Sequence, residues 1–252
     1  MSAAILCAAT LWQRELVRFY RQPSRVVGAL ASPLMFWLLL GSGIGTSFRS
    51  GKTSSYLAYF FPGTLLMILF FTAIFSTISI IEDRREGFLQ SVLVAPVPRF
   101  SVVLGKVLGG STLALIQAAL FLLLAPFAGA HPGIAGWLRA IPVLFLNGFL
   151  LTCLGFIVAW RFQSIQGFHA VMNLFLMPLW ILSGALFPPE GASIWIRTIM
   201  KFNPLSYGLD ALRASLNGGA MGHSFVISLV FAVLLFALAS FTARRNQAGD
   251  LI

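Results

Sequence analysis

Charged residues are scarce in this chain, and carboxylates are the scarcest of them. Only 10% of the 252 residues are charged and seven are aspartate or glutamate, whereas 58% are hydrophobic. A soluble domain carries about 25% charged residues. The composition therefore excludes a separate soluble domain and predicts one all-α integral membrane domain over residues 1–252.

Cysteine and histidine are also too few and too scattered for the sites they usually build. The cysteines, Cys7 and Cys153, are far apart in the sequence, so we expect no structural disulfide. The three histidines lie in different segments without metal-ligand spacing, so we expect no metal site. The net charge of +10 comes from basic residues that flank apolar runs, as is typical of membrane proteins. We therefore expect no nucleic-acid partner.

Two further absences bear on function. The tripeptide Gly51-Lys52-Thr53 resembles the end of a P-loop, but the motif needs a glycine at the position of Thr46, so we expect no nucleotide or other cofactor in this chain. No carboxylate lies in the middle of an apolar run, which disfavours a proton-driven carrier. The sequence also lacks an acid, histidine and nucleophile constellation. A secondary carrier, a channel and a membrane-embedded enzyme remain the alternatives to the function inferred below.

Long apolar runs are abundant. A spanning helix needs about 20 mostly apolar residues, and the qualifying runs are residues 26–45, 56–81, 102–126, 138–160, 168–187 and 224–243. Eleven of the lysines and arginines fall on the side of the termini, against six on the opposite side, which predicts cytoplasmic termini. The eleven are Arg14, Arg18, Arg21, Arg25, Arg84, Arg85, Arg99, Lys106, Arg161, Arg244 and Arg245.

Two segments outside these runs have helical periodicity. Residues 1–22 predict an amphipathic helix on the cytoplasmic leaflet, with arginines on one side and an apolar face on the other. The apolar face comprises Ile5, Ala8, Ala9, Trp12, Leu16 and Phe19. This helix either anchors the chain or also contacts a soluble partner. Residues 188–222 predict a hairpin of two short helices at the outer leaflet, broken at Asn203-Pro204.

The most informative segment is a short charged sequence, residues 82–87, between the second and third apolar runs. Three of the seven carboxylates, Glu82, Asp83 and Glu86, lie within five residues of each other. Each charge inside a bilayer costs roughly 2.5–3.5 kcal/mol, so residues 82–101 predict a cytoplasmic loop offered to a soluble partner. We expect Glu86 to begin a short helix in this loop, where a carboxylate favours the helix dipole. The alternative is a solvated cluster in which Glu82 pairs with Arg85.

The order of these features resembles the type-2 ABC exporter permeases, the family of drug and polysaccharide export subunits. The first matching block spans residues 61–110, and its shared points are Pro62-Gly63, Glu86-Gly87, Leu93, Ala95-Pro96, Arg99 and Gly105-Lys106. The second spans residues 172–213, and its shared points are Pro178, Ser183-Gly184, Phe187-Pro188, Asn203-Pro204, Tyr207, Asp210 and Arg213. Together with the length and the six apolar runs, the resemblance covers nearly the whole chain.

The resemblance implies the permease subunit of an ATP-driven exporter in a prokaryotic inner membrane. It implies a second permease copy, either identical or a close homologue, and two cytoplasmic ABC ATPase subunits that carry the ATP and magnesium. The cargo would be hydrophobic, amphiphilic or lipid-linked. The implied ATPase-coupling residues are Glu82, Asp83, Arg84, Arg85, Glu86, Gly87, Phe88 and Leu89, with Arg14 and Arg18 of the N-terminal helix. The implied substrate path, along the second and fifth runs, includes Phe71, Phe75, Asn173 and Met177.

Overall fold

A computed structural model describes residues 3–44 and 55–245 of the chain, and these residues form helices without any strand. Six of the helices are long and apolar enough to cross a membrane. The long helices are α1 (Ala3–Tyr20), α2 (Pro23–Ile44), α3 (Tyr56–Arg85), α5 (Arg99–Leu122), α6 (Ile134–Ala159), α7 (Ile165–Trp180) and α10 (Gly222–Arg245). Arg49 and the Gly51-Lys52-Thr53 tripeptide lie outside the described residues.

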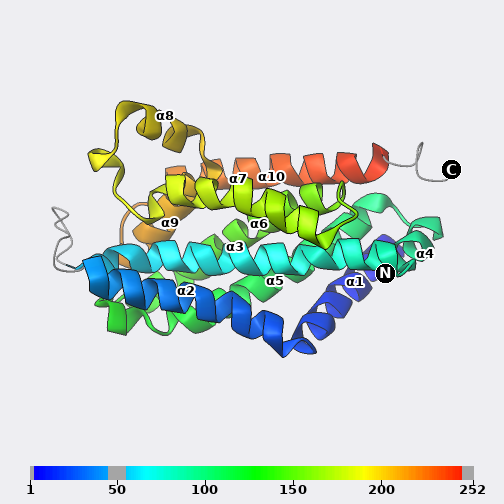
Figure 1. Cartoon of the computed structure of the whole chain (residues 1–252), viewed down its shortest axis with the longest axis horizontal. Helices are drawn as coiled ribbons and strands as arrows, with labels where there is room; N and C mark the ends of the chain where they lie inside the picture. Colours follow the sequence, from blue (N-terminus) through cyan, green and yellow to red (C-terminus); the bar gives the residue numbers. More distant parts are fainter. Residues whose placement is uncertain (1–2, 45–54, 246–252) are drawn as a thin grey trace.

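The bundle has two ends, which we name by their short helices. α4 (Phe88–Val94) lies at one end, beside the described ends of α1 and α10, and α8 (Ile194–Phe202) lies at the other (Figure 1). The six long apolar helices other than α1 run between these ends, and each overlaps one predicted run. α5 stops at Leu122, before the predicted boundary at residue 126, and Pro126 lies in the following short turn Ala125–Ala128 (η1).

α3 forms the centre of the bundle. It packs against α2, α5 and α6, and between Phe60 and Ile81 nearly every side chain is buried. A helix that is apolar on all sides is typical of a protein core or of a membrane span. The partly buried exceptions in this stretch are Phe71 and Phe75. α3 is thus the most buried of the helices that run between the two ends of the bundle.

The α8 end contains the predicted pair of short helices. α8 is followed at Asn203 by α9 (Pro204–Asn217), so the break falls at the expected Asn203-Pro204 position. The Asn203 side chain accepts a hydrogen bond from the Leu205 N–H (3.0 Å) and donates one to the Leu179 carbonyl (2.6 Å). α9 packs against α6 and α10. The location of this hairpin relative to a bilayer stays a prediction.

α7 does not continue regularly to the α8 end. It passes into an irregular turn, Ile181–Ala185 (η2), in which Gly184 has φ of 89°, a conformation that favours glycine. The free Gly184 carbonyl accepts hydrogen bonds from the Tyr59 hydroxyl (2.8 Å) and the Arg213 guanidinium (2.8 Å). The Trp180 indole donates to the Gly63 carbonyl (3.0 Å). The α7 turn is therefore held against α3 and α9.

Candidate functional site

Residues 82–85 of the short charged sequence form the last turn of α3 rather than a loop. α3 continues to Arg85, and the Glu86 N–H still bonds to the Glu82 carbonyl (2.9 Å). The turn to α4 is made by Gly87, which has φ of 76°. The expectation that Glu86 begins the short helix is therefore wrong. Glu86 caps the C-terminal end of α3, where the helix dipole disfavours a carboxylate and favours Arg84 and Arg85.

Two arginines of α1 neutralise this end of α3. Arg14 donates to the Asp83 carboxylate through both terminal guanidinium nitrogens, at 2.9 and 2.7 Å. Arg18 donates to Asp83 (2.7 Å) and to Glu82 (2.8 Å). The Asp83 side chain is 0% exposed, so the alternative of a solvated cluster is wrong for this residue. Because Arg14 and Arg18 pair with Glu82 and Asp83, the helix can continue four residues beyond the predicted end of the span.

A buried lysine completes the arrangement. The Lys106 ammonium, on α5, donates to Glu15 of α1 (2.5 Å), to Ser79 of α3 (3.2 Å) and to Asp83. Lys106 is 5% exposed and Glu15 is 3% exposed. Buried charges are retained when they are paired and hydrogen-bonded, and this set is electrically balanced. We call it the charge cluster: Arg14, Glu15, Arg18, Glu82, Asp83 and Lys106.

The site expected from the sequence omitted Glu15, and Lys106 entered the sequence analysis only through the basic bias and the family resemblance. A signal for both was present. The buried face of α1 consists of Ala8, Leu11, Glu15 and Phe19, spaced by three or four residues, so an acid interrupts an otherwise apolar stripe. This face overlaps the predicted apolar face only at Ala8 and Phe19. A lysine within an apolar run and an acid within an apolar stripe indicate a buried pair.

The site also contacts α4, through Arg14 of α1, and the connection between α6 and α7, through Arg84 of α3. The Arg14 guanidinium lies 3.8 Å from the centre of the Phe88 ring, a cation–π contact with the first residue of α4. Burial opposes the charge of Arg14, but the hydrogen bond and charge of Asp83 outweigh it and raise the pKa of Arg14. Arg84 donates to the carbonyls of Trp160 (2.7 Å) and Phe162 (3.3 Å).

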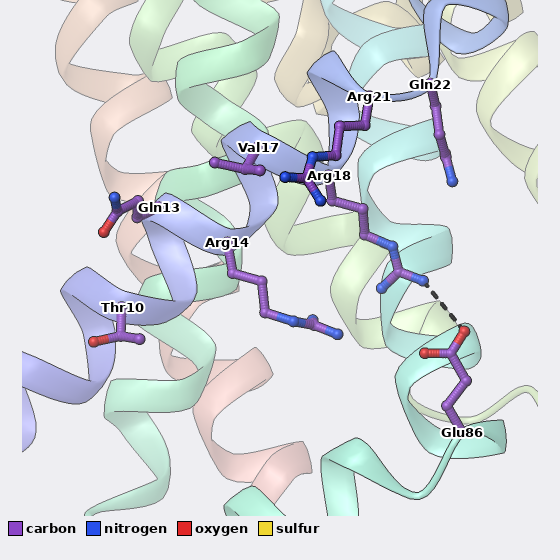
Figure 2. A pocket seen from close by; sticks show the side chains of 8 residues that line it. All are labelled: Thr10, Gln13, Arg14, Val17, Arg18, Arg21, Gln22 and Glu86. Atoms are coloured by element: carbon purple, nitrogen blue, oxygen red, sulfur yellow. Dashed lines mark ion pairs between the residues drawn. The ribbon is translucent and has the colours of Figure 1, made fainter.

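An open hollow of about 630 Å³ lies between α1 and the α3–α4 turn. Figure 2 shows Arg14 and Arg18 extending from α1 toward the side of Glu86, with Arg21 near the far end of the hollow. Its lining residues are Thr10, Gln13, Arg14, Val17, Arg18, Arg21, Gln22 and Glu86. The Glu86 side chain is 61% exposed and lies 3.7 Å from Arg18. The outer layer of the site is thus polar and open to solvent, and the buried members of the charge cluster are Glu15, Asp83 and Lys106.

The proposed path residues lie on α3 and α7. Phe71 and Phe75 stack with ring centres 6.1 Å apart, and the Phe75 ring lies 6.0 Å from that of His169 on α7. On α7, Asn173 is exposed and Met177 is half-buried. The structure therefore places the two phenylalanines at the one partly open stretch of central α3, beside α7.

Comparison with known proteins decides the family. The family model described as "ABC-2 type transporter" matches residues 8–217, which include the whole charge cluster, α4 and α7. The chain belongs to the ABC-2 type transporter family. It is a membrane permease subunit, and members of this family cooperate with an ABC ATPase.

Individual relatives of this ABC-2 permease include two that are named as permeases. A putative transport permease ycf38 of Cyanophora paradoxa is 28% identical over 242 residues, which cover 94% of this chain and 81% of the relative. Nodulation protein J of Rhizobium leguminosarum bv. trifolii is 27% identical, covering 94% and 92%. The daunorubicin resistance ABC transporter permease protein DrrB1 of Streptomyces coeruleorubidus is 25% identical, covering 94% and 85%. The similarity therefore extends along almost the entire permease.

Proposed function

We propose that this permease moves a hydrophobic, amphiphilic or lipid-linked substrate out of the cytoplasm or the inner leaflet of a prokaryotic inner membrane. Two copies, or one copy and a close homologue, would pair, and two ABC ATPase subunits would bind at the α4 end. ATP and magnesium would be held by those ATPase subunits and not by this chain. The relative named for daunorubicin resistance supports an amphiphilic cargo.

One observation carries the proposal: α3 joins the solvent-exposed α4 end to the partly open Phe71–Phe75 stretch. Asp83 lies twelve positions after Phe71 in α3, which is about 18 Å at 1.5 Å per residue. Because α3 is regular between these points, displacement of its end is transmitted to the phenylalanines without a hinge. The ATPase-coupling residues are Glu82 to Leu89, with Arg14 and Arg18, and the path includes Phe71, Phe75, Asn173 and Met177.

Exposed apolar side chains and the positions of the termini support the proposed placement in the membrane. α1 exposes Ile5 and Leu6, which supports its lying at the cytoplasmic lipid surface with the charge cluster beneath it. Both described termini lie at the α4 end (Figure 1), and the basic bias of the sequence supports a cytoplasmic location for that end.

Reconstitution tests the function. The permease, purified with its cognate ABC ATPase, is placed in proteoliposomes with the ATPase outside. We expect ATP-dependent accumulation of daunorubicin, a fluorescent amphiphile, or ATP-dependent translocation of a fluorescent phospholipid. An ATPase-dead complex is the control, and native mass spectrometry counts the chains. If neither probe moves with ATP, or if the active complex holds a single permease, the proposal is wrong.

A further inference from the structure

Lys106 has a more demanding environment than the other cations at the α4 end. An ammonium has three N–H donors, and Lys106 directs them to acceptors on two other helices: Glu15 on α1, and Ser79 and Asp83 on α3. The lysine itself belongs to α5. One buried group therefore joins three helices through directional bonds.

The backbone around Lys106 is shaped for this contact. Gly105 and Gly109 flank the lysine on the face of α5 that meets α1. A Cβ on Gly105 would lie 2.7 Å from the Ala8 carbonyl oxygen, and one on Gly109 would lie 2.6 Å from the Cβ of Glu15. Any larger residue would force α1 away from α5, and the Glu15 carboxylate would no longer reach the ammonium.

A strong buried link is not required for stability alone. Replacing a buried ion pair by apolar side chains of similar volume is often neutral or stabilising, whereas removal of one partner is costly. Directional bonds hold the helices that they join in a single relative position, whereas apolar side chains can pack at several registers. At this end of the bundle, position matters because α1 and the α3–α4 turn line one solvent-open surface.

We propose that Lys106 is a positioning residue for energy coupling: by binding Glu15 and Asp83 together it makes α1, α3 and α5 one rigid unit. A force applied to α1 or to α4 then displaces the central helix instead of tilting α1 alone. If the permease is driven by an ATPase as proposed above, Lys106 sets how much ATP hydrolysis is converted into transport, without touching either the ATPase or the substrate.

The test compares two matched pairs of apolar replacements in the reconstituted complex. Lys106→Met with Glu15→Met removes the link between α5 and α1 without leaving a buried charge of that pair. Thr72→Val with Gln117→Met is the control, because Thr72 donates to Gln117 (2.7 Å) as a buried polar pair between α3 and α5 that does not involve α1. Daunorubicin transport and ATP hydrolysis are measured for both variants and for the wild type.

We expect the Lys106→Met/Glu15→Met variant to reach normal membrane levels and to hydrolyse ATP, with transport per ATP reduced at least roughly fivefold, the lower end of allosteric coupling factors. The control pair should keep the wild-type ratio. Spin labels at Tyr20 of α1 and Arg161 at the end of α6, both exposed, should give a narrow distance distribution in the wild type and a broad one in the variant. Cys7 and Cys153 are replaced beforehand.

Three outcomes would overturn the inference. The first is a variant with wild-type transport per ATP, and the second is an unchanged distance distribution. The third is loss of the double variant from the membrane, because the link would then serve stability. A wild-type complex that hydrolyses ATP without moving either probe refutes the transport function itself, and the spin-label measurement still decides whether Lys106 positions α1.

Discussion

Asp83 offers the sharpest test of how the α4 end is built. Its buried carboxylate is bound by Arg14, Arg18 and Lys106. The substitution Asp83→Asn keeps the shape of the side chain but leaves three cations around a neutral group. Removing one partner of a buried ion pair costs about 3–5 kcal/mol, a large fraction of the roughly 5–15 kcal/mol that stabilises a folded protein.

The matched control is Glu86→Gln, three residues further along the chain. The Glu86 side chain is 61% exposed and its ion pair with Arg18 is 3.7 Å long. An exposed pair of this kind is worth under about 1 kcal/mol. The same loss of one negative charge should therefore have very different effects at the two positions, because only Asp83 is screened from solvent.

The assay is thermal unfolding of the purified permease in detergent. For a chain of 150–250 residues, 1 kcal/mol corresponds to roughly 2–4 °C in Tm, so Asp83→Asn should lower Tm by about 6–20 °C and Glu86→Gln by at most about 4 °C. Limited proteolysis should also release α1 from the Asp83→Asn variant first. Equal Tm values for the two variants would refute the view that the charge cluster is a buried, mutually dependent unit.

Three other predictions follow from single positions. Glu86→Ala should leave membrane levels normal but weaken binding of the ATPase and reduce transport, because the exposed carboxylate of Glu86 faces the open hollow. Glu190→Ala at the opposite end is the control. Equal co-purification of the ATPase with both variants would contradict a docking role for Glu86. Cysteines at Gln90 and Gly191, in a background without Cys7 and Cys153, should react with an impermeant maleimide from the inside and the outside respectively, and external labelling at Gln90 would reverse the topology. Gly208→Ala should cost about 1–3 kcal/mol by overpacking, since its Cβ would lie 1.8 Å from Asn147, whereas Gly28→Ala has open space and should be neutral or stabilising in the same unfolding assay.

The membrane helices and the family could be predicted from the sequence because both depend on long-range composition and motif order. The apolar runs are interrupted by charge at the ends of α3 and α10, and the hairpin break at Asn203-Pro204 is marked by a proline that begins α9. Even so, the end of α3 was placed too early. Charged residues at a span end normally indicate a loop, and here Glu82 and Asp83 stay helical because α1 supplies their partners.

Spacing along the sequence signals Glu15 and Lys106 as charged residues among apolar ones, but it does not show that they meet Asp83 in one cluster. Arg14 and Arg18 were expected to face a soluble partner together with the acidic segment, yet they bind that segment directly. Which face of α1 is buried depends on how closely α1 approaches α5, and that distance is set by Gly105 and Gly109 on another helix. Only the tertiary structure shows that Glu15 is buried in this contact, whereas Trp12 donates to the Thr112 hydroxyl of α5 (3.1 Å) and stays 37% exposed.

The charge cluster also has a consequence for biogenesis. Glu15 and Asp83 precede Lys106 in the chain, so both carboxylates leave the ribosome before the lysine does. We expect α5 to enter the membrane after α1 and α3 are in place, so that its cation meets its acceptors and the cost of inserting a lone ammonium is avoided. The order of synthesis and the electrostatics of the finished bundle would then agree.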